Sequence, residues 1–139
     1  MRRFLVIGNL TITSQELMDY LLDRASEGPC ELRIVVPASH PRGAWSEGSV
    51  RADAEARLRA AMLRLGAAGV DASGEVGDAS PVAAVADAVA AGPVYDEIVI
   101  STLPIGPSVW LRQDVPHRVQ REHRAIPVTH VVATPQLVG

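Results

Sequence analysis

Small polar side chains follow two of the apolar segments of this sequence. Asn9 and Thr11 come shortly after the apolar run 4–7, and Ser101 and Thr102 follow the run 98–100. Amide and hydroxyl groups of this kind can hydrogen-bond the ribose or phosphate of a nucleotide, and the backbone at the end of a third apolar run can meet a base. The candidate nucleotide-binding residues are Asn9, Thr11, Val36, Ser101, Thr102, Gly106 and Ser108.

The residue types needed for catalysis are present, but their spacing does not build a catalytic site. No Gly-x-Ser-x-Gly turn exposes a serine nucleophile. The histidines His40, His117, His123 and His130 lack the spacing of metal ligands, and Cys30, alone just before a strand, is expected to be a packing residue. We therefore expect no catalytic residues and no metal site, so that the protein is not an enzyme.

All 13 basic residues are arginine, and this excludes several functional classes. A Walker-A loop, a protein kinase and a Schiff-base enzyme each require a lysine. The formal charge of −3 argues against duplex nucleic acid as a partner, and two Trp, two Tyr and one Phe are too few for single-strand stacking. A single cysteine, and no apolar run of the ~20 residues that span a membrane, predict a cytoplasmic protein with no membrane partner.

Five strands and four helices are predicted to position the candidate residues. The continuous apolar runs 4–7 and 98–100 are typical of strands buried on both faces. Three further strands are predicted at 32–36, at 70–76 and from Pro127 to Val132. Helical spacing of apolar residues lies between these strands, at 17–25, 54–65 and 82–89, and the last helix is predicted to be capped by Asp114.

Alternation of strands and helices predicts an α/β fold with a parallel sheet and right-handed crossovers. We expect one domain over residues 1–139, with a flexible loop at 37–50. The most apolar strands belong in the centre, which gives a five-stranded parallel sheet in the order 3-2-1-4-5 with helices on both faces. In such a sheet ligands bind beyond the carboxyl ends of the strands, where the winding reverses, which here is between the first and fourth strands.

The chain resembles the universal stress protein family over nearly its full length, and three segments carry this resemblance. Gly77-Asp78 with the apolar residues 82–85 is similar to the turn after that family's third strand. Residues 96–102 are similar to its fourth strand, and 115–119 with 126–128 to its last helix and strand. The resemblance implies a Rossmann-like fold of the adenine nucleotide alpha hydrolase type, a role in stress response, and a homodimer paired along the strand from Pro127 to Val132.

ATP-binding members of that family have an Asp after the first strand, Gly-x-x-Gly after the fourth, and Gly with Ser or Thr before the last helix. In this chain Asn9 stands at the first of these places. At the second, Ser101 replaces the first glycine, and Pro104 or, in a shifted loop, Gly106 stands at the second glycine. Gln113 and Asp114 stand at the third place. Proline has no N–H for a phosphate oxygen. A carboxylate ~4 Å from a phosphate is repelled by about 1 kcal/mol even in water.

The degraded motif leaves two functions open. The first is a small regulatory domain that binds a nucleotide or related molecule at the switch between the first and fourth strands. ATP and AMP both remain candidates, although the motif disfavours a triphosphate. The second is an interaction protein that works as a dimer and has no nucleotide ligand.

Overall fold

The computed structural model describes residues 1–38, 47–104 and 109–133 of the chain. Strands and helices alternate as predicted, except that two helices, α4 and α5, separate the last two strands. The elements are β1 (Arg2–Ile7), α1 (Gln15–Ser26), β2 (Cys30–Pro37), α2 (Glu47–Ala67), β3 (Ala72–Gly77), α3 (Pro81–Ala91), β4 (Glu97–Thr102), α4 (Val109–Arg112), α5 (Val115–Glu122) and β5 (Val128–Val132).

The five strands form one parallel sheet in the order β3-β2-β1-β4-β5, which confirms the predicted topology. In the centre of the sheet Val6 lies between Ile34 of β2 and Val99 of β4. Every residue of β4 is buried, as the continuous apolar run predicts, whereas β5 at the outer edge is only partly buried.

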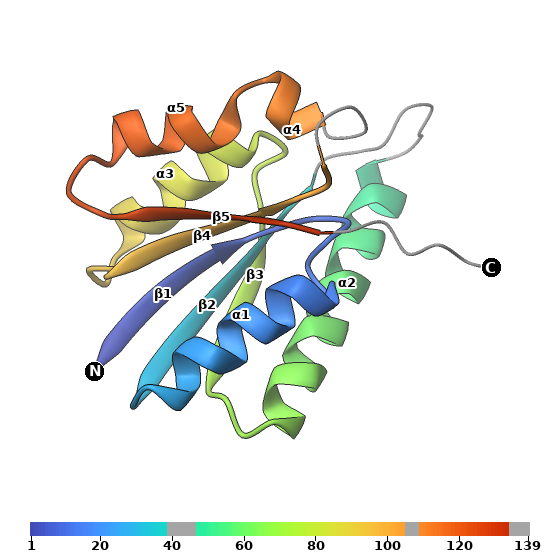
Figure 1. Cartoon of the computed structure of the whole chain (residues 1–139). Coiled ribbons are helices and arrows are strands. Elements are labelled where there is room, and N and C mark those ends of the chain that lie inside the picture. Colours follow the sequence, from blue (N-terminus) through green and yellow to red (C-terminus); the bar gives the residue numbers. More distant parts are fainter. Residues whose placement is uncertain (39–46, 105–108, 134–139) are drawn as a thin grey trace.

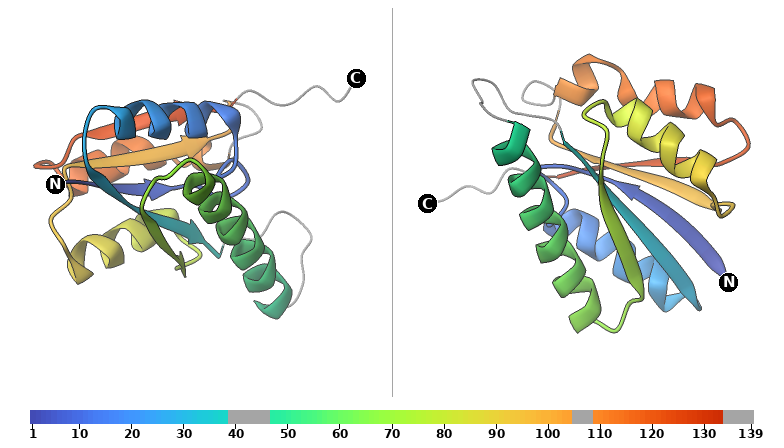
Figure 2. Two further views of the ribbon diagram at one scale, coloured as in Figure 1. Left: turned by 90° about the horizontal axis from the view of Figure 1, so that it is seen from below. Right: turned by 180° about the vertical axis from the view of Figure 1, so that it is seen from behind.

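Two hydrophobic cores lie on the two faces of this sheet, because successive side chains of each strand point to opposite faces. Phe4 and Val6 of β1 face the core beneath α1 and α2. Leu5 and Ile7 face the core shared with α3 and α5. Figures 1 and 2 show these two helical layers with the sheet between them. The fold is therefore a three-layer α/β sandwich.

Serine side chains cap the helices α1 and α3. Ser14 accepts a hydrogen bond from the Leu17 N–H at the start of α1. Ser80 does the same for Ala83 at the start of α3, where Pro81 occupies the first helical turn. These caps set where the loops after β1 and β3 end.

Both boundaries of the expected loop 37–50 differ from the prediction. Helix α2 begins at Glu47, inside the expected loop 37–50, and Pro37 is the last residue of β2. Val50 is buried, so packing of this first turn accounts for the earlier start. Residues 39–46 of that loop lie outside the described residues. The short helix α4 lies within a segment that we expected to be a loop throughout.

Asp114 does not cap α5, and this prediction was wrong. The residue has a left-handed backbone, with φ 56° and ψ 39°, and its side chain makes no capping hydrogen bond. A capping side chain needs an extended backbone to reach the first amides of a helix. Asp114 instead donates its N–H to the Leu111 carbonyl, which ends α4, and its Oδ1 lies 2.7 Å from Nδ1 of His117.

Candidate functional site

The carboxyl ends of β1 and β4 lie side by side at the point where the winding of the sheet reverses. Ile7 is paired with Ile100, so the chain leaves both strands at the same edge. This places Asn9 and Thr11, which follow β1, close to Ser101 and Thr102 at the end of β4. Val36 is near the end of β2, on the other side of β1. Of the predicted site residues, Gly106 and Ser108 lie outside the described residues.

Thr11 and Ser101 are joined by a hydrogen bond of 2.7 Å between their hydroxyl oxygens. Both side chains are buried, with 5% and 1% of their surface exposed. Gly8 permits this close approach, because a Cβ atom there would lie 3.0 Å from Cδ1 of Ile12 and 3.4 Å from Cβ of Ser101. The two hydroxyls hold the loop after β1 against β4 and do not face solvent.

Thr102 is also buried, and its hydroxyl is bonded on two sides. It donates to the Leu103 carbonyl at 2.8 Å and lies 2.7 Å from Nε2 of His130 on β5. Because that proton is used, the Thr102 oxygen accepts from the imidazole N–H. Burial, and then the nearby His117, lower the pKa of His130, which favours this neutral imidazole. The contact joins the end of β4 to the middle of β5.

Asn9 is the predicted site residue whose side chain remains partly exposed at this edge. Its Oδ1 accepts a hydrogen bond of 2.7 Å from Nη1 of Arg57, a residue of α2. Seven residues further along α2, Arg64 donates to the Thr13 carbonyl and, at 3.3 Å, to Oε1 of Gln15. Two arginines therefore reach the loop between β1 and α1.

These arginines were missed at the sequence level. The spacing of seven residues puts Arg57 and Arg64 on one side of a helix, and that was the available signal. Their acceptors, however, depend on how α2 lies across the sheet. Val36 is completely buried, with 0% of the residue's surface exposed.

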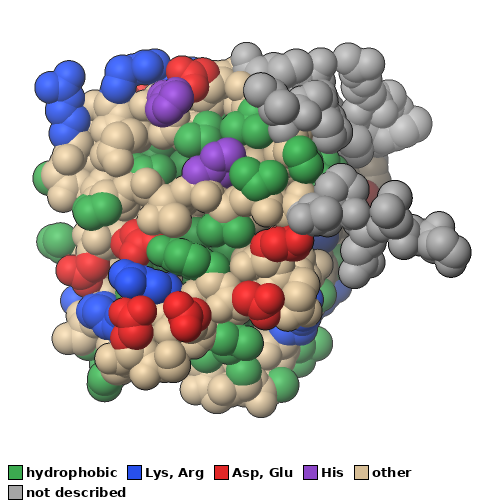
Figure 3. All heavy atoms as spheres, in the orientation of Figure 1, with side chains coloured by type: hydrophobic (Ala, Val, Ile, Leu, Met, Phe, Trp, Pro, Cys, Tyr) green, Lys and Arg blue, Asp and Glu red, His purple; other side chains and the backbone are tan. Residues whose placement is uncertain are grey.

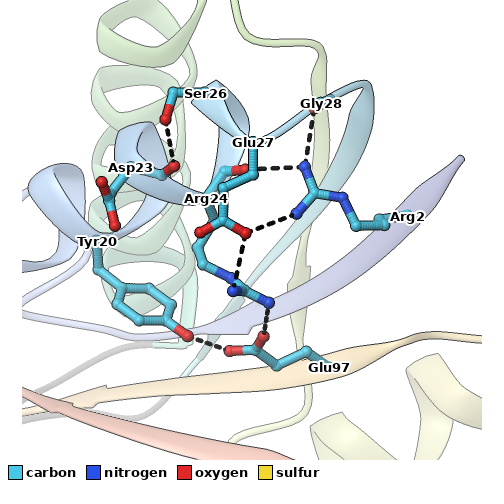
Figure 4. Close-up of polar contacts among 8 residues, drawn as sticks. All are labelled: Arg2, Tyr20, Asp23, Arg24, Ser26, Glu27, Gly28 and Glu97. Atoms are coloured by element: carbon cyan, nitrogen blue, oxygen red, sulfur yellow. Dashed lines mark hydrogen bonds and ion pairs between the residues drawn. The ribbon is translucent and has the colours of Figure 1, made fainter.

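A charged network lies at the other side of the sheet from this site, at the amino ends of β1 and β4, and Figure 4 shows it in detail. Glu97, at the start of β4, is 6% exposed, and its Oε1 accepts from Arg24 at 2.9 Å. Tyr20 donates its hydroxyl to the other carboxylate oxygen. Burial, and then this hydrogen bond, raise the pKa of Tyr20. The carboxylate is thus compensated by a cation and a hydroxyl, both from α1.

Arg2 extends this network to the end of α1. It donates to the Arg24 and Gly28 carbonyls, each at 2.9 Å, and pairs with Glu27. The guanidinium groups of Arg2 and Arg24 each lie 5.4 Å from the centre of the Phe4 ring, within the range of cation–π attraction. Each of these side chains has a partner within the fold, although the buried Nε–H of Arg24 has none, and we assign the network a structural role.

In the described part of the chain, no three His, Cys, Asp or Glu residues gather closely enough to hold a metal ion. None of its helices combines the length and the apolar character needed to cross a membrane.

Comparison with known proteins rests on structure, since no protein-family model and no curated protein matches the sequence. A universal stress protein family structure from Burkholderia pseudomallei is 18% identical, with a TM-score of 0.58 over 92% of this chain and 93% of that chain. A universal stress protein in complex with cAMP is 19% identical, with a TM-score of 0.52 over 95% and 96% of the two chains. The resemblance found in the sequence is confirmed at the level of architecture: the chain has the fold of the universal stress proteins.

Proposed function

We propose that the protein is a member of the universal stress protein family and a regulatory domain without catalytic activity. In this proposal it binds a nucleotide at the carboxyl edge of the sheet, between the loops after β1 and β4. The observation that carries it is the reversal of winding between these strands, with the Asn9 amide and the Arg57 guanidinium at the edge. The structure of a protein with this fold in complex with cAMP supports the same ligand class.

The ligand that fits this edge best carries one phosphate. A triphosphate needs several backbone N–H groups arranged around its oxygens, and Pro104, close to the end of β4, has none. The carboxylate of Asp114, between α4 and α5, adds a negative charge near the start of the last helix. Both features favour a nucleoside monophosphate, linear or cyclic, over ATP.

Thermal unfolding with added ligand tests this function. We expect AMP or cAMP to raise the melting temperature, and ATP with Mg²⁺ to do so much less. A ligand that binds the folded state stabilises it by ~2.7 kcal/mol at a hundredfold excess over the dissociation constant. Adenosine, without phosphate, is the control for binding of the base and sugar alone. If none of these compounds changes the melting temperature at millimolar concentration, the protein does not bind adenine nucleotides.

A second candidate function, homodimerisation through β5, is favoured by the exposed edge of the sheet. β5 is the outer strand, and Val132 at its end is 43% exposed. In the view in which β5 crosses the front, hydrophobic side chains lie above and to the right of a histidine in the upper half of this face (Figure 3). An uncovered strand edge is a template for pairing with another chain.

Sedimentation velocity over a range of protein concentrations tests this second function. A dimer that Val132→Arg dissociates would support pairing along β5. A monomer at all concentrations would exclude it and would leave the nucleotide proposal unaffected.

A further inference from the structure

The two arginines of α2 that hold the loop after β1 do so through neutral oxygens. Arg57 donates to the amide oxygen of Asn9, and Arg64 to the Thr13 carbonyl and the Gln15 amide oxygen. None of these acceptors carries a charge. The described contacts therefore leave the positive charges of both guanidinium groups without a negative partner.

Six other arginines of the described chain are paired with carboxylates instead. Their ion pairs are Arg2–Glu27, Arg3–Glu31, Arg24–Glu97, Arg33–Glu75, Arg51–Glu55 and Arg121–Asp114. An acidic protein supplies enough carboxylates for such pairing, with 16 acidic against 13 basic residues. Arg57 thus differs from these arginines in that its partner, the amide oxygen of Asn9, is neutral.

Arg57 is also placed to receive an anion. Its partner Asn9 is two residues beyond the end of β1, at the edge where ligands of such sheets bind. The contact with Asn9 uses one N–H of the five on a guanidinium group, whose planar fork matches two phosphate oxygens. Partial burial of Arg57 reduces the screening of its charge by water and salt.

We propose that Arg57 binds the phosphate group of the ligand, and that Asn9 positions the guanidinium for this contact. The inference rests on the proposed function and assigns the residue that distinguishes a nucleotide from a nucleoside there. One guanidinium offers one bidentate contact, which suits a single phosphate. Arg64 lies about 10 Å further along α2, and its contacts hold the loop.

Calorimetric titration of AMP and adenosine into matched variants tests the assignment. In Arg57→Gln we expect AMP to bind about tenfold to a hundredfold more weakly, the range for losing a hydrogen bond to a charged group. Adenosine affinity should stay within about twofold, because the lost contact is to phosphate. Arg59→Gln is the control, since it removes the same charge from an exposed position of the same helix and should change neither affinity.

Asn9→Ala provides a second variant, because it removes the amide oxygen that positions the guanidinium of Arg57. AMP affinity should fall in this variant, while adenosine affinity stays within about twofold. Raising the ionic strength should weaken the binding of AMP to the unaltered protein and leave that of adenosine unchanged.

The outcomes separate this inference from the proposed function. If Arg57→Gln weakens AMP and adenosine equally, or neither of them, Arg57 is not the phosphate contact, although the nucleotide site stands. If the unaltered protein binds adenosine but gains nothing from the phosphate of AMP, the inference is also overturned. If it binds neither compound, the proposed function and the inference both fail.

Discussion

The hydroxyl oxygens of Thr11 and Ser101 lie 2.7 Å apart, although the two residues are 90 positions apart in the chain. This buried contact joins the loop after β1 to the last residues of β4, across the point where the winding of the sheet reverses. A ligand at this edge meets a loop whose position is already set by the sheet. The partly exposed Asn9, which precedes Thr11 in the same loop, is held in place by this contact and by Arg57.

The first prediction concerns the coupling between these two hydroxyls. Thr11→Val and Ser101→Ala should each lower the free energy of unfolding by about 1–3 kcal/mol, because each leaves a buried hydroxyl without its partner. The double variant should lose clearly less than the sum, since neither hydroxyl then remains. Urea denaturation of the four proteins measures the coupling. Additive losses would show that the two hydroxyls do not interact in solution.

The second prediction is a loss of stability at alkaline pH that depends on Tyr20. Its pKa is raised above the ordinary value of 10.0 by burial and by the bond to Glu97. The folded protein therefore keeps this proton at a pH at which the unfolded chain releases it. The resulting stabilisation is complete below pH 10 and is lost as the pH rises through the folded-state pKa.

Tyr20→Phe removes this titration and should make the alkaline loss of stability shallower. Urea denaturation between about pH 8 and pH 11 measures the slope, and tyrosinate absorbance reports the titration directly. Tyr95, whose pKa burial also raises, remains in both proteins, so a residual slope is expected. Identical slopes in both proteins would contradict the assignment.

The third prediction compares a glycine of β3 with a glycine of α2. At Gly74 of β3 a Cβ atom would lie 2.5 Å from Cδ1 of Leu58 and 2.9 Å from the backbone oxygen of Ile34. The backbone oxygen cannot move aside, so Gly74→Ala should cost about 1–3 kcal/mol. Gly66→Ala, in the last turn of α2 with nothing within 4 Å, should stabilise by up to about 1 kcal/mol. Equal effects of the two substitutions would rule out this close packing of β3 against α2.

The fourth prediction tests the left-handed backbone of Asp114. A residue with a Cβ atom pays about 1–2 kcal/mol for this conformation, and glycine does not. Asp114→Gly should therefore be more stable to urea than Asp114→Ala by about 1 kcal/mol. Both variants lose the contact with His117, so the comparison isolates the backbone. The reverse order would be expected only of an extended or helical backbone at this position.

The strand order could be predicted because burial on both faces leaves a direct mark on the sequence. The runs 4–7 and 98–100 are continuously apolar, and they form the paired strands β1 and β4. The helix caps at Ser14 and Ser80 are equally local, since each serine accepts from the backbone N–H three residues further along. Placing Asn9, Thr11, Ser101 and Thr102 at one edge then followed from the topology alone.

The contacts of those residues could not be predicted, because they depend on how distant elements pack. Nothing near Thr11 in the sequence indicates that its hydroxyl turns inward to Ser101. Arg57 reaches Asn9 over 48 residues, through the position of α2 on the sheet. Asp114 has the residue type of a helix cap, but in the short connection between α4 and α5 it has a left-handed backbone, from which its side chain does not cap α5.

The two ends of β1 are fastened by different kinds of force. At its amino end, Arg2 belongs to the ionic network of Arg24, Glu27 and Glu97, whereas the loop at its carboxyl end is joined to β4 by uncharged hydroxyls. We therefore expect added salt to weaken the contacts at the amino end of β1 and to leave those at its carboxyl end unchanged. Between low and high salt, hydrogen-exchange rates should then change at the amino end of β1 and stay the same at its carboxyl end, next to the switch point.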